Sequence, residues 1–150
     1  KWLNMMRDKL GLFGEDKEDK KLINDLFNWM EKNKVDYTNT FCHLMEIKID
    51  DKDYKDENFI EWLNRWKKRS KLNSPSKEKQ IKLMKKTNPI VIPRNHKVEE
   101  ALKEANKGNL EKMNKLNAIL KNPYKNQNEI EEYQVPAPIS GEKYQTFCGT

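Results

Sequence analysis

Apolar residues recur along this 150-residue chain at intervals of three and four, the spacing typical of amphipathic α-helices. Alternation with a period of two, which would indicate half-buried strands, is nearly absent. Glycine, proline and asparagine interrupt the helical pattern at several points. The expected helices cover residues 2–11, 16–33, 38–45, 58–72, 74–86, 95–107 and 110–121. We therefore predict an all-α fold, an irregular bundle of about seven helices.

Short polar residues mark where several of these helices begin and end. Thr38 or Asn39 is the expected N-cap of one helix, and Asn95 is the expected N-cap of another, because their side chains accept hydrogen bonds from free backbone N–H groups. Gly108 is expected to end the helix that begins near residue 95, and Asn109 to cap the next one. The short joint between these two helices predicts an antiparallel helical hairpin.

The helical pattern stops at residue 121, and this divides the chain in two. Residues 1–121 are expected to form the helical region of a larger protein, since the sequence begins with Lys1 in place of methionine. Residues 122–150 contain three prolines and are predicted to form an extended, partly disordered tail.

The low content of hydrophobic residues limits the size of the core that these helices can bury. Hydrophobic residues make up 35% of the chain and charged residues 36%, whereas globular domains are about 45–50% apolar. Two explanations stay open. The helices have long solvated faces, or the core is completed against a neighbouring domain that the sequence does not include.

Positive charge is concentrated in the middle of the chain. Residues 62–97 hold 12 basic residues and one acidic residue, a net charge of +11, although the net charge of the whole chain is only +6. The residues of the expected basic patch lie on two consecutive helices: Arg65, Lys67, Lys68, Arg69, Lys71, Lys79, Lys82 and Lys86. Such a block can neutralise phosphates of a nucleic acid. We instead expect a solvated face, or one that faces an acidic surface, because no nucleic-acid-binding motif accompanies it.

Residues with catalytic or metal-binding chemistry are few and scattered. The sequence has no glycine-rich phosphate loop, and it lacks the catalytic loop and metal-binding Asp-Phe-Gly motif of kinases. His43, His96, Cys42 and Cys148 do not have metal-ligand spacing. The acidic stretch 49–57 lacks the glycine and glutamate register of a calcium loop. We therefore predict no catalytic, cofactor-binding or metal site in this chain.

The sequence has no apolar run long enough to span a membrane and no visible signal peptide. Its two cysteines, far apart, do not form a disulfide framework. We expect a cytoplasmic protein without a membrane partner.

Three short phrases, in a fixed order, resemble the selenoprotein O family. The residues that carry the resemblance are Asp36, Tyr37, Thr38 and Asn39, then Asn88, Pro89, Arg94 and Asn95, then Asn122, Pro123 and Tyr124. A helical hairpin between the second and third phrases also resembles the family. A cysteine near the end, Cys148, matches a redox position in the family's C-terminal region.

The resemblance implies a role for the chain that its own residues do not reveal. Members of the family have a kinase-like fold, described as a pseudokinase, and transfer AMP from ATP to protein hydroxyls. The complete protein is therefore expected to use ATP and magnesium and to act on protein substrates in the bacterial cytoplasm. This chain is expected to be its non-catalytic C-terminal region, which buttresses the missing kinase-like domain.

Two departures from the family pattern limit which family roles can be assigned to residues of this chain. Cys42 follows the first phrase where relatives commonly have arginine, so it has no expected family role. Gln145 stands three residues before Cys148, so a local Cys-x-x-Cys couple is impossible. Cys148 is still the redox candidate. The alternative is an independent helical module that binds nucleic acid or a protein through residues 62–97.

Overall fold

A computed structural model describes residues 1–49, 52–73 and 76–137. Across these ranges the chain forms eight α-helices and one short 3-10 helix, with no strand, which confirms the all-α prediction. The elements are α1 (Trp2–Lys9), α2 (Asp19–Asn33), α3 (Tyr37–Leu44), η1 (Lys52–Lys55), α4 (Glu57–Asn73), α5 (Lys77–Thr87), α6 (Asn95–Ala105), α7 (Glu111–Leu120) and α8 (Glu131–Gln134).

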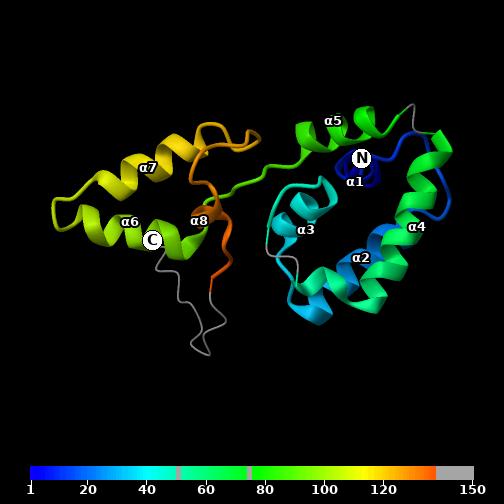
Figure 1. Cartoon of the computed structure of the whole chain (residues 1–150), viewed down its shortest axis with the longest axis horizontal. Coiled ribbons are helices and arrows are strands. Elements are labelled where there is room, and N and C mark those ends of the chain that lie inside the picture. Colours follow the sequence, from blue (N-terminus) through cyan, green and yellow to red (C-terminus); the bar gives the residue numbers. More distant parts are fainter. Residues whose placement is uncertain (50–51, 74–75, 138–150) are drawn as a thin grey trace.

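The helices gather into two groups, which Figure 1 shows side by side. In the larger group α2 packs on α4, and α1 packs on both α5 and α2, while α3 lies within the curve of these helices. In the smaller group α6 and α7 form the predicted antiparallel hairpin, and α8 lies beside it. The extended segment 88–94 connects the two groups.

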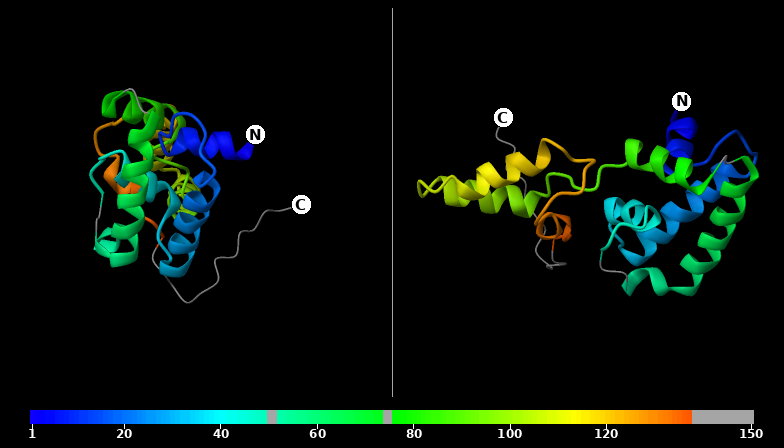
Figure 2. Two further views of the ribbon diagram at one scale, coloured as in Figure 1. Left: turned by 90° about the vertical axis from the view of Figure 1, so that its right-hand side faces the viewer. Right: turned by 45° about the horizontal axis from the view of Figure 1, so that its top comes forward.

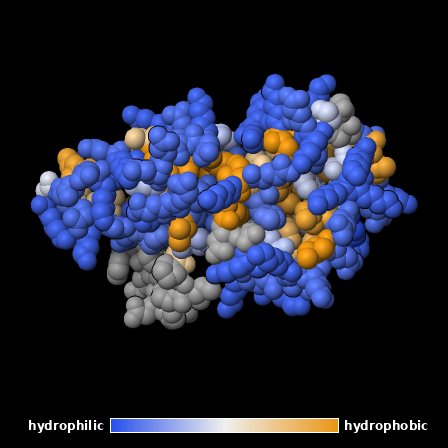
Figure 3. Space-filling model, viewed as in Figure 1, coloured by the Kyte–Doolittle hydropathy of each residue, from blue (hydrophilic) through white to orange (hydrophobic). Residues whose placement is uncertain are grey.

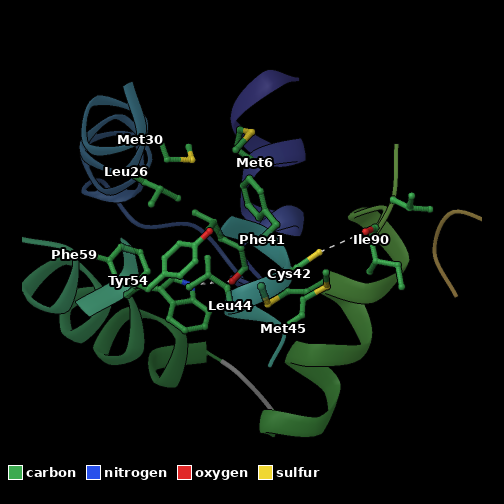
Figure 4. Close-up of a cluster of buried hydrophobic side chains, with 14 of the residues drawn as sticks. Met6, Leu26, Met30, Phe41, Cys42, Leu44, Met45, Tyr54, Phe59 and Ile90 are labelled. Atoms are coloured by element: carbon green, nitrogen blue, oxygen red, sulfur yellow. Dashed lines mark hydrogen bonds between the residues drawn. The ribbon is translucent and has the colours of Figure 1, made fainter. Parts of the chain in front are cut away.

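The main core surrounds α3. Phe41 and Cys42 of α3 and Phe59 and Trp62 of α4 are almost completely buried. Figure 4 shows Met6 of α1 pointing into the same cluster. Because α3 is short and contributes to this core along most of its length, its position is set by packing more than by its own helix propensity.

Two tryptophans of α4 also hold its neighbours by hydrogen bonds. The indole Nε1 of Trp66 donates to the carbonyl of Leu10, 2.9 Å away, at the end of α1. The indole Nε1 of Trp62 donates to the carbonyl of Leu22 in α2, at 2.8 Å. The last carbonyls of a helix lack partners within the helix, so the Trp66 bond satisfies a group that would otherwise be buried unpaired.

The predicted N-caps of α3 and α6 are wrong. Asp36 is the N-cap of α3, since its carboxylate accepts from the backbone N–H of Asn39, and Thr38 and Asn39 lie inside the helix. Arg94 precedes α6, so Asn95 is its first helical residue. In both places several polar residues follow one another, and the cap preference alone does not distinguish them.

Other predicted helix ends are closer to the structure. Gly108, with a φ of 87°, lies in the joint of the hairpin, after α6 has ended at Ala105. The N-cap of α7 is Leu110 and not the predicted Asn109, although the side chain of Asn109 accepts from the N–H of Glu111. Ser76 caps α5. The predicted start at Ser74 and Pro75 lies outside the described residues.

The described part of the predicted tail, residues 122–137, differs from an extended chain. It contains α8, and Ile130 and Tyr133 are buried. Lys97 of α6 forms an ion pair with Glu132 at 2.7 Å and lies 5.7 Å from the centre of the Tyr133 ring. A four-residue helix held by these contacts leaves no periodic pattern, so the sequence gives no sign of it.

The surface reflects the high content of charged residues. Figure 3 shows a face that is mostly hydrophilic, with hydrophobic residues gathered toward its middle. In the part of the chain that the structure describes, no helix combines the length and apolar character needed to cross a bilayer.

Candidate functional site

Residues from each of the three family phrases meet where the two helical groups come together. The centre of this junction is an ion pair between Asp36 and Arg94. Arg94 Nη1 donates to Asp36 Oδ2 at 2.7 Å, and Arg94 Nη2 donates to Asp36 Oδ1 at 3.0 Å. The same carboxylate caps α3 through the N–H of Asn39 at 2.8 Å. One side chain therefore fixes the start of a core helix and the segment that leads to the hairpin.

The environment keeps Asp36 ionised. Burial alone would raise the pKa of Asp36, but hydrogen bonds from Arg94 and from the N–H of Asn39 outweigh burial and hold this pKa below its ordinary value. The Arg94 side chain is itself almost fully buried. A carboxylate with this arrangement is a structural anion and not a proton donor or acceptor at neutral pH.

A second set of bonds reaches α8. Asn39 Nδ2 donates to the carbonyl of Gln134 at 3.1 Å, and Gln134 Nε2 donates to the carbonyl of Ile90 at 2.8 Å. Arg94 Nη2 also donates to Asn39 Oδ1 at 3.3 Å. Gln134 is a residue that the sequence analysis missed, because its partners lie 44 and 95 positions away.

Asn88 links the second phrase to α1. Its Nδ2 donates to the carbonyls of Lys9 and Met84 at 2.8 and 2.9 Å. Its Oδ1 accepts from Lys9 Nζ at 3.2 Å. Asn88 is buried and uses its whole amide to close the ends of α1 and α5, which is a structural role.

The third phrase contacts the junction through a backbone hydrogen bond. The carbonyl of Pro123 accepts from the N–H of Ile90 at 2.7 Å. The carbonyl of Asn122 accepts from Gln127 Nε2 at 2.9 Å, within the same loop. Tyr124 is exposed, so the structure does not bring its hydroxyl to the junction. Asn95 is exposed as well, and Pro89 is half-buried.

Cys42 lies beside this junction but is closed off from solvent. Its Sγ lies 3.9 Å from the carbonyl of Ile90, as Figure 4 shows. Burial, with a smaller contribution from Asp36, raises the pKa of the Cys42 thiol to about 12. A buried thiol with so little thiolate is a poor nucleophile and a poor metal ligand. The redox candidate Cys148 lies outside the described residues.

The two arginines of the expected basic patch are engaged in ion pairs. Arg69 is buried, and its Nε and Nη2 donate to the carboxylate of Asp19 at 2.6 and 3.1 Å. Arg7 donates to the same carboxylate at 2.7 Å. Arg65 pairs with Asp25 at 2.7 Å. Arg69 is therefore part of the interior and not of a surface that could bind phosphates.

The lysines of the patch are at the surface. They are Lys67, Lys68, Lys71, Lys79, Lys82 and Lys86.

The buried cluster of Asp19, Arg7 and Arg69 was missed by the sequence analysis, because these three charged residues lie far apart in sequence. An aspartate in the first turn of a helix is common enough that it carries no signal of burial.

The histidines do not join the cysteine in a metal site. The His43 ring stacks on Tyr54 with ring centres 4.1 Å apart. His96 lies at the start of α6, where burial and the neighbouring Lys97 and Arg94 charges lower its pKa. Over residues 1–49, 52–73 and 76–137, no group of three or more His, Cys, Asp or Glu side chains could hold a metal ion.

Comparison with known proteins shows the family to which this chain belongs. Residues 1–121 match the family described as "Protein adenylyltransferase SelO". The chain belongs to the SelO family. The resemblance read from the three phrases is therefore confirmed.

Relatives in the SelO family extend this similarity to the whole chain. "Protein nucleotidyltransferase YdiU" of Pelagibacter ubique is 56% identical over 151 residues, which cover 100% of this chain and 31% of the relative. The proteins of the same name from Nitrosococcus oceani and Bacillus thuringiensis are 42% and 44% identical, each over 99% of this chain and 31% of the relative. The chain thus spans about a third of the length of these curated relatives.

Proposed function

We propose that this chain is the helical C-terminal region of an enzyme that transfers AMP from ATP to protein hydroxyls, and that it supports the kinase-like part without taking part in the chemistry. Membership of the SelO family supports the activity of the complete protein. The relatives named nucleotidyltransferases are about three times as long as this chain, which leaves room in them for a catalytic part.

One observation carries the supporting role. Four polar side chains of the family phrases bind one another or backbone groups. They belong to Asp36, Arg94, Asn39 and Asn88, and their bonds join separate elements of the fold. Residues of a nucleotide site would instead present free donors and carboxylates to phosphate and metal. We therefore assign the phrases to the architecture of the enzyme.

The remaining features of the complete enzyme follow from the family. ATP and magnesium are its cofactors, and its partners are protein substrates. The kinase-like, pseudokinase-type part of the same protein is the neighbour of this chain. The three relatives are from bacteria, and we place the enzyme in the bacterial cytoplasm. Cys148 is proposed as its redox residue.

Two proteins test this function. The first is the chain alone, titrated with Mg-ATP by calorimetry and assayed for transfer of labelled AMP to protein. The second, the composite enzyme, is the Pelagibacter ubique relative with its matching 151 residues replaced by this chain. We expect no micromolar ATP binding and no transfer by the chain alone, and transfer by the composite enzyme.

Two results would overturn the proposal. One is micromolar ATP binding by the chain alone, or transfer that persists through purification. The other is a rate of AMP transfer that stays within about twofold of the parent when all of the inserted residues are deleted from the composite enzyme. A twofold change in rate corresponds to only about 0.4 kcal/mol in the activation free energy, so the chain would then contribute almost nothing to the activity.

A further inference from the structure

Four apolar side chains from three helices form a continuous patch on the surface, which we call the aromatic patch: Trp2, Met5, Phe27 and Tyr37. The ring centre of Phe27 in α2 lies 6.2 Å from that of Trp2 in α1 and 6.1 Å from that of Tyr37 in α3. Met5 lies one turn after Trp2 on α1. Trp2, Met5 and Tyr37 are 43%, 48% and 42% exposed.

The aromatic patch is held in place from below. The Tyr37 ring packs against the buried Phe41 ring, with centres 4.9 Å apart. Lys9 Nζ lies 5.7 Å from the centre of the Tyr37 ring and 5.3 Å from that of Phe41. These contacts fix the shape of the patch before any partner arrives, which reduces the entropy lost on docking.

The start of α1 also stands clear of the other helices. The left view of Figure 2 shows the first turn of α1 projecting from the larger group. Trp2 and Met5 lie in this turn and the next, so a partner can reach them. Exposed tryptophan, tyrosine and methionine side chains gathered in one place are typical of the core of a protein interface.

We propose that the aromatic patch docks against an apolar surface of the kinase-like part of the same enzyme, an inference that rests on the proposed function. The relatives contain more than twice as much additional chain as the part matched here. In a C-terminal region the preceding chain enters at Lys1, directly beside Trp2. This tether places the preceding domain at a high effective concentration next to the patch, so a modest apolar contact is enough for stable docking.

Photo-crosslinking in the composite enzyme tests this docking. A benzophenone amino acid replaces Met5 in one protein and Leu110 in a control protein, and crosslinked peptides are mapped by mass spectrometry. Leu110 is 55% exposed and lies in the joint of the distant hairpin. We expect position 5 to crosslink to peptides that precede Lys1 in the same molecule. Position 110 should give at least about tenfold less of these products, because the joint of the hairpin lies in the other helical group, far from α1 (Figure 1).

A charge substitution provides a second readout. Met5→Glu in the composite enzyme should lower the midpoint of thermal unfolding by at least about 3 °C, whereas the same change in the chain alone should have little effect, because Met5 is exposed there. Leu110→Glu should have little effect in both proteins.

The possible results distinguish a failure of the docking inference from a failure of the proposed function. Crosslinks from position 5 to a second molecule, to residues 138–150 or only to this chain's own helices would overturn the docking inference. An equal effect of Met5→Glu in both proteins would do the same. If AMP transfer still depends on the inserted chain in these cases, the supporting role stands and only the surface is wrong.

Discussion

The guanidinium group of Arg94 binds both carboxylate oxygens of Asp36, a residue 58 positions earlier in the sequence. Asp36 begins a helix of the main core, and Arg94 immediately precedes the hairpin. This pair therefore connects the two helical groups and brings together two phrases that lie far apart in the sequence.

Arg94→Met should destabilise the chain by about 2–4 kcal/mol, because it leaves the carboxylate of Asp36 without its main partner in a largely buried place. Unfolding in urea, followed by circular dichroism, measures the change. Lys77→Met is the matched control. It breaks an exposed ion pair with Glu46 and should cost less than about 0.5 kcal/mol. Equal effects of the two substitutions would contradict the assigned role of Arg94.

The buried Asp19 predicts a pH dependence of stability. Burial opposes its ionisation, but hydrogen bonds from Arg69 and Arg7 outweigh burial and hold the pKa of Asp19 below its ordinary value. The unfolded chain, with a pKa of about 3.9, therefore binds a proton first as the pH falls. The stabilisation is complete above that value and is lost as the pH falls through the lower folded-state pKa.

Asp19→Asn isolates this contribution. Urea unfolding of both proteins between pH 7 and pH 3 should show a stability gap that is widest near neutral pH and narrows below about pH 4. A gap that stays constant over this range would show that the ionisation of Asp19 is not coupled to folding.

Gly11 is predicted to resist substitution. It has a φ of 64°, and a Cβ atom there would lie 2.6 Å from Gln80 Cγ and 2.9 Å from Met84 Cγ on α5. Gly11→Ala should therefore cost about 2–3 kcal/mol, from backbone strain and overpacking together. Gly108→Ala is the control, because its φ is 87° but nothing lies within 4 Å. Gly108→Ala should lower the free energy of unfolding by about 1 kcal/mol, from backbone strain alone.

Cys42 should be the slower of the two thiols. Its Sγ is buried and its pKa is raised to about 12 by burial, so almost no thiolate is present at pH 8. We expect Cys42 to be alkylated at least about 100-fold more slowly than a free thiol with a pKa near 8.5. Timed alkylation and peptide mapping measure both cysteines. Faster labelling of Cys42 than of Cys148, or a disulfide between them, would contradict this prediction.

The sequence predicts helices correctly where a single apolar face determines how the helix packs. The apolar stripe of Leu22, Leu26 and Met30 predicts α2, and the hairpin follows from Gly108 and the stripes on each side. The cap at Asp36 was missed because three polar residues follow it closely. The Asp19 cluster and Gln134 were missed because their partners come from distant segments, and single-sequence periodicity contains no information about such pairs.

The family phrases show the same limit more sharply. Their order in the sequence identifies the family, and nothing in that order indicates that Asp36, Arg94 and Pro123 meet at one junction. That convergence depends on the path of segment 88–94 between the two helical groups. Several of the bonds that result are to backbone carbonyls, which every residue has and no motif can mark.

The central claim is that the phrase residues maintain the architecture of the enzyme and take no part in AMP transfer. The most direct test is the kinetics of the composite enzyme with Arg94→Met, compared with Lys86→Met as an exposed control, below the temperature at which either unfolds. We predict a lower midpoint of thermal unfolding for Arg94→Met, with KM for ATP and kcat per folded molecule both within about threefold of the parent. A loss of more than about 100-fold in kcat in a folded enzyme, equal to about 2.7 kcal/mol of barrier, would instead place Arg94 in the chemistry.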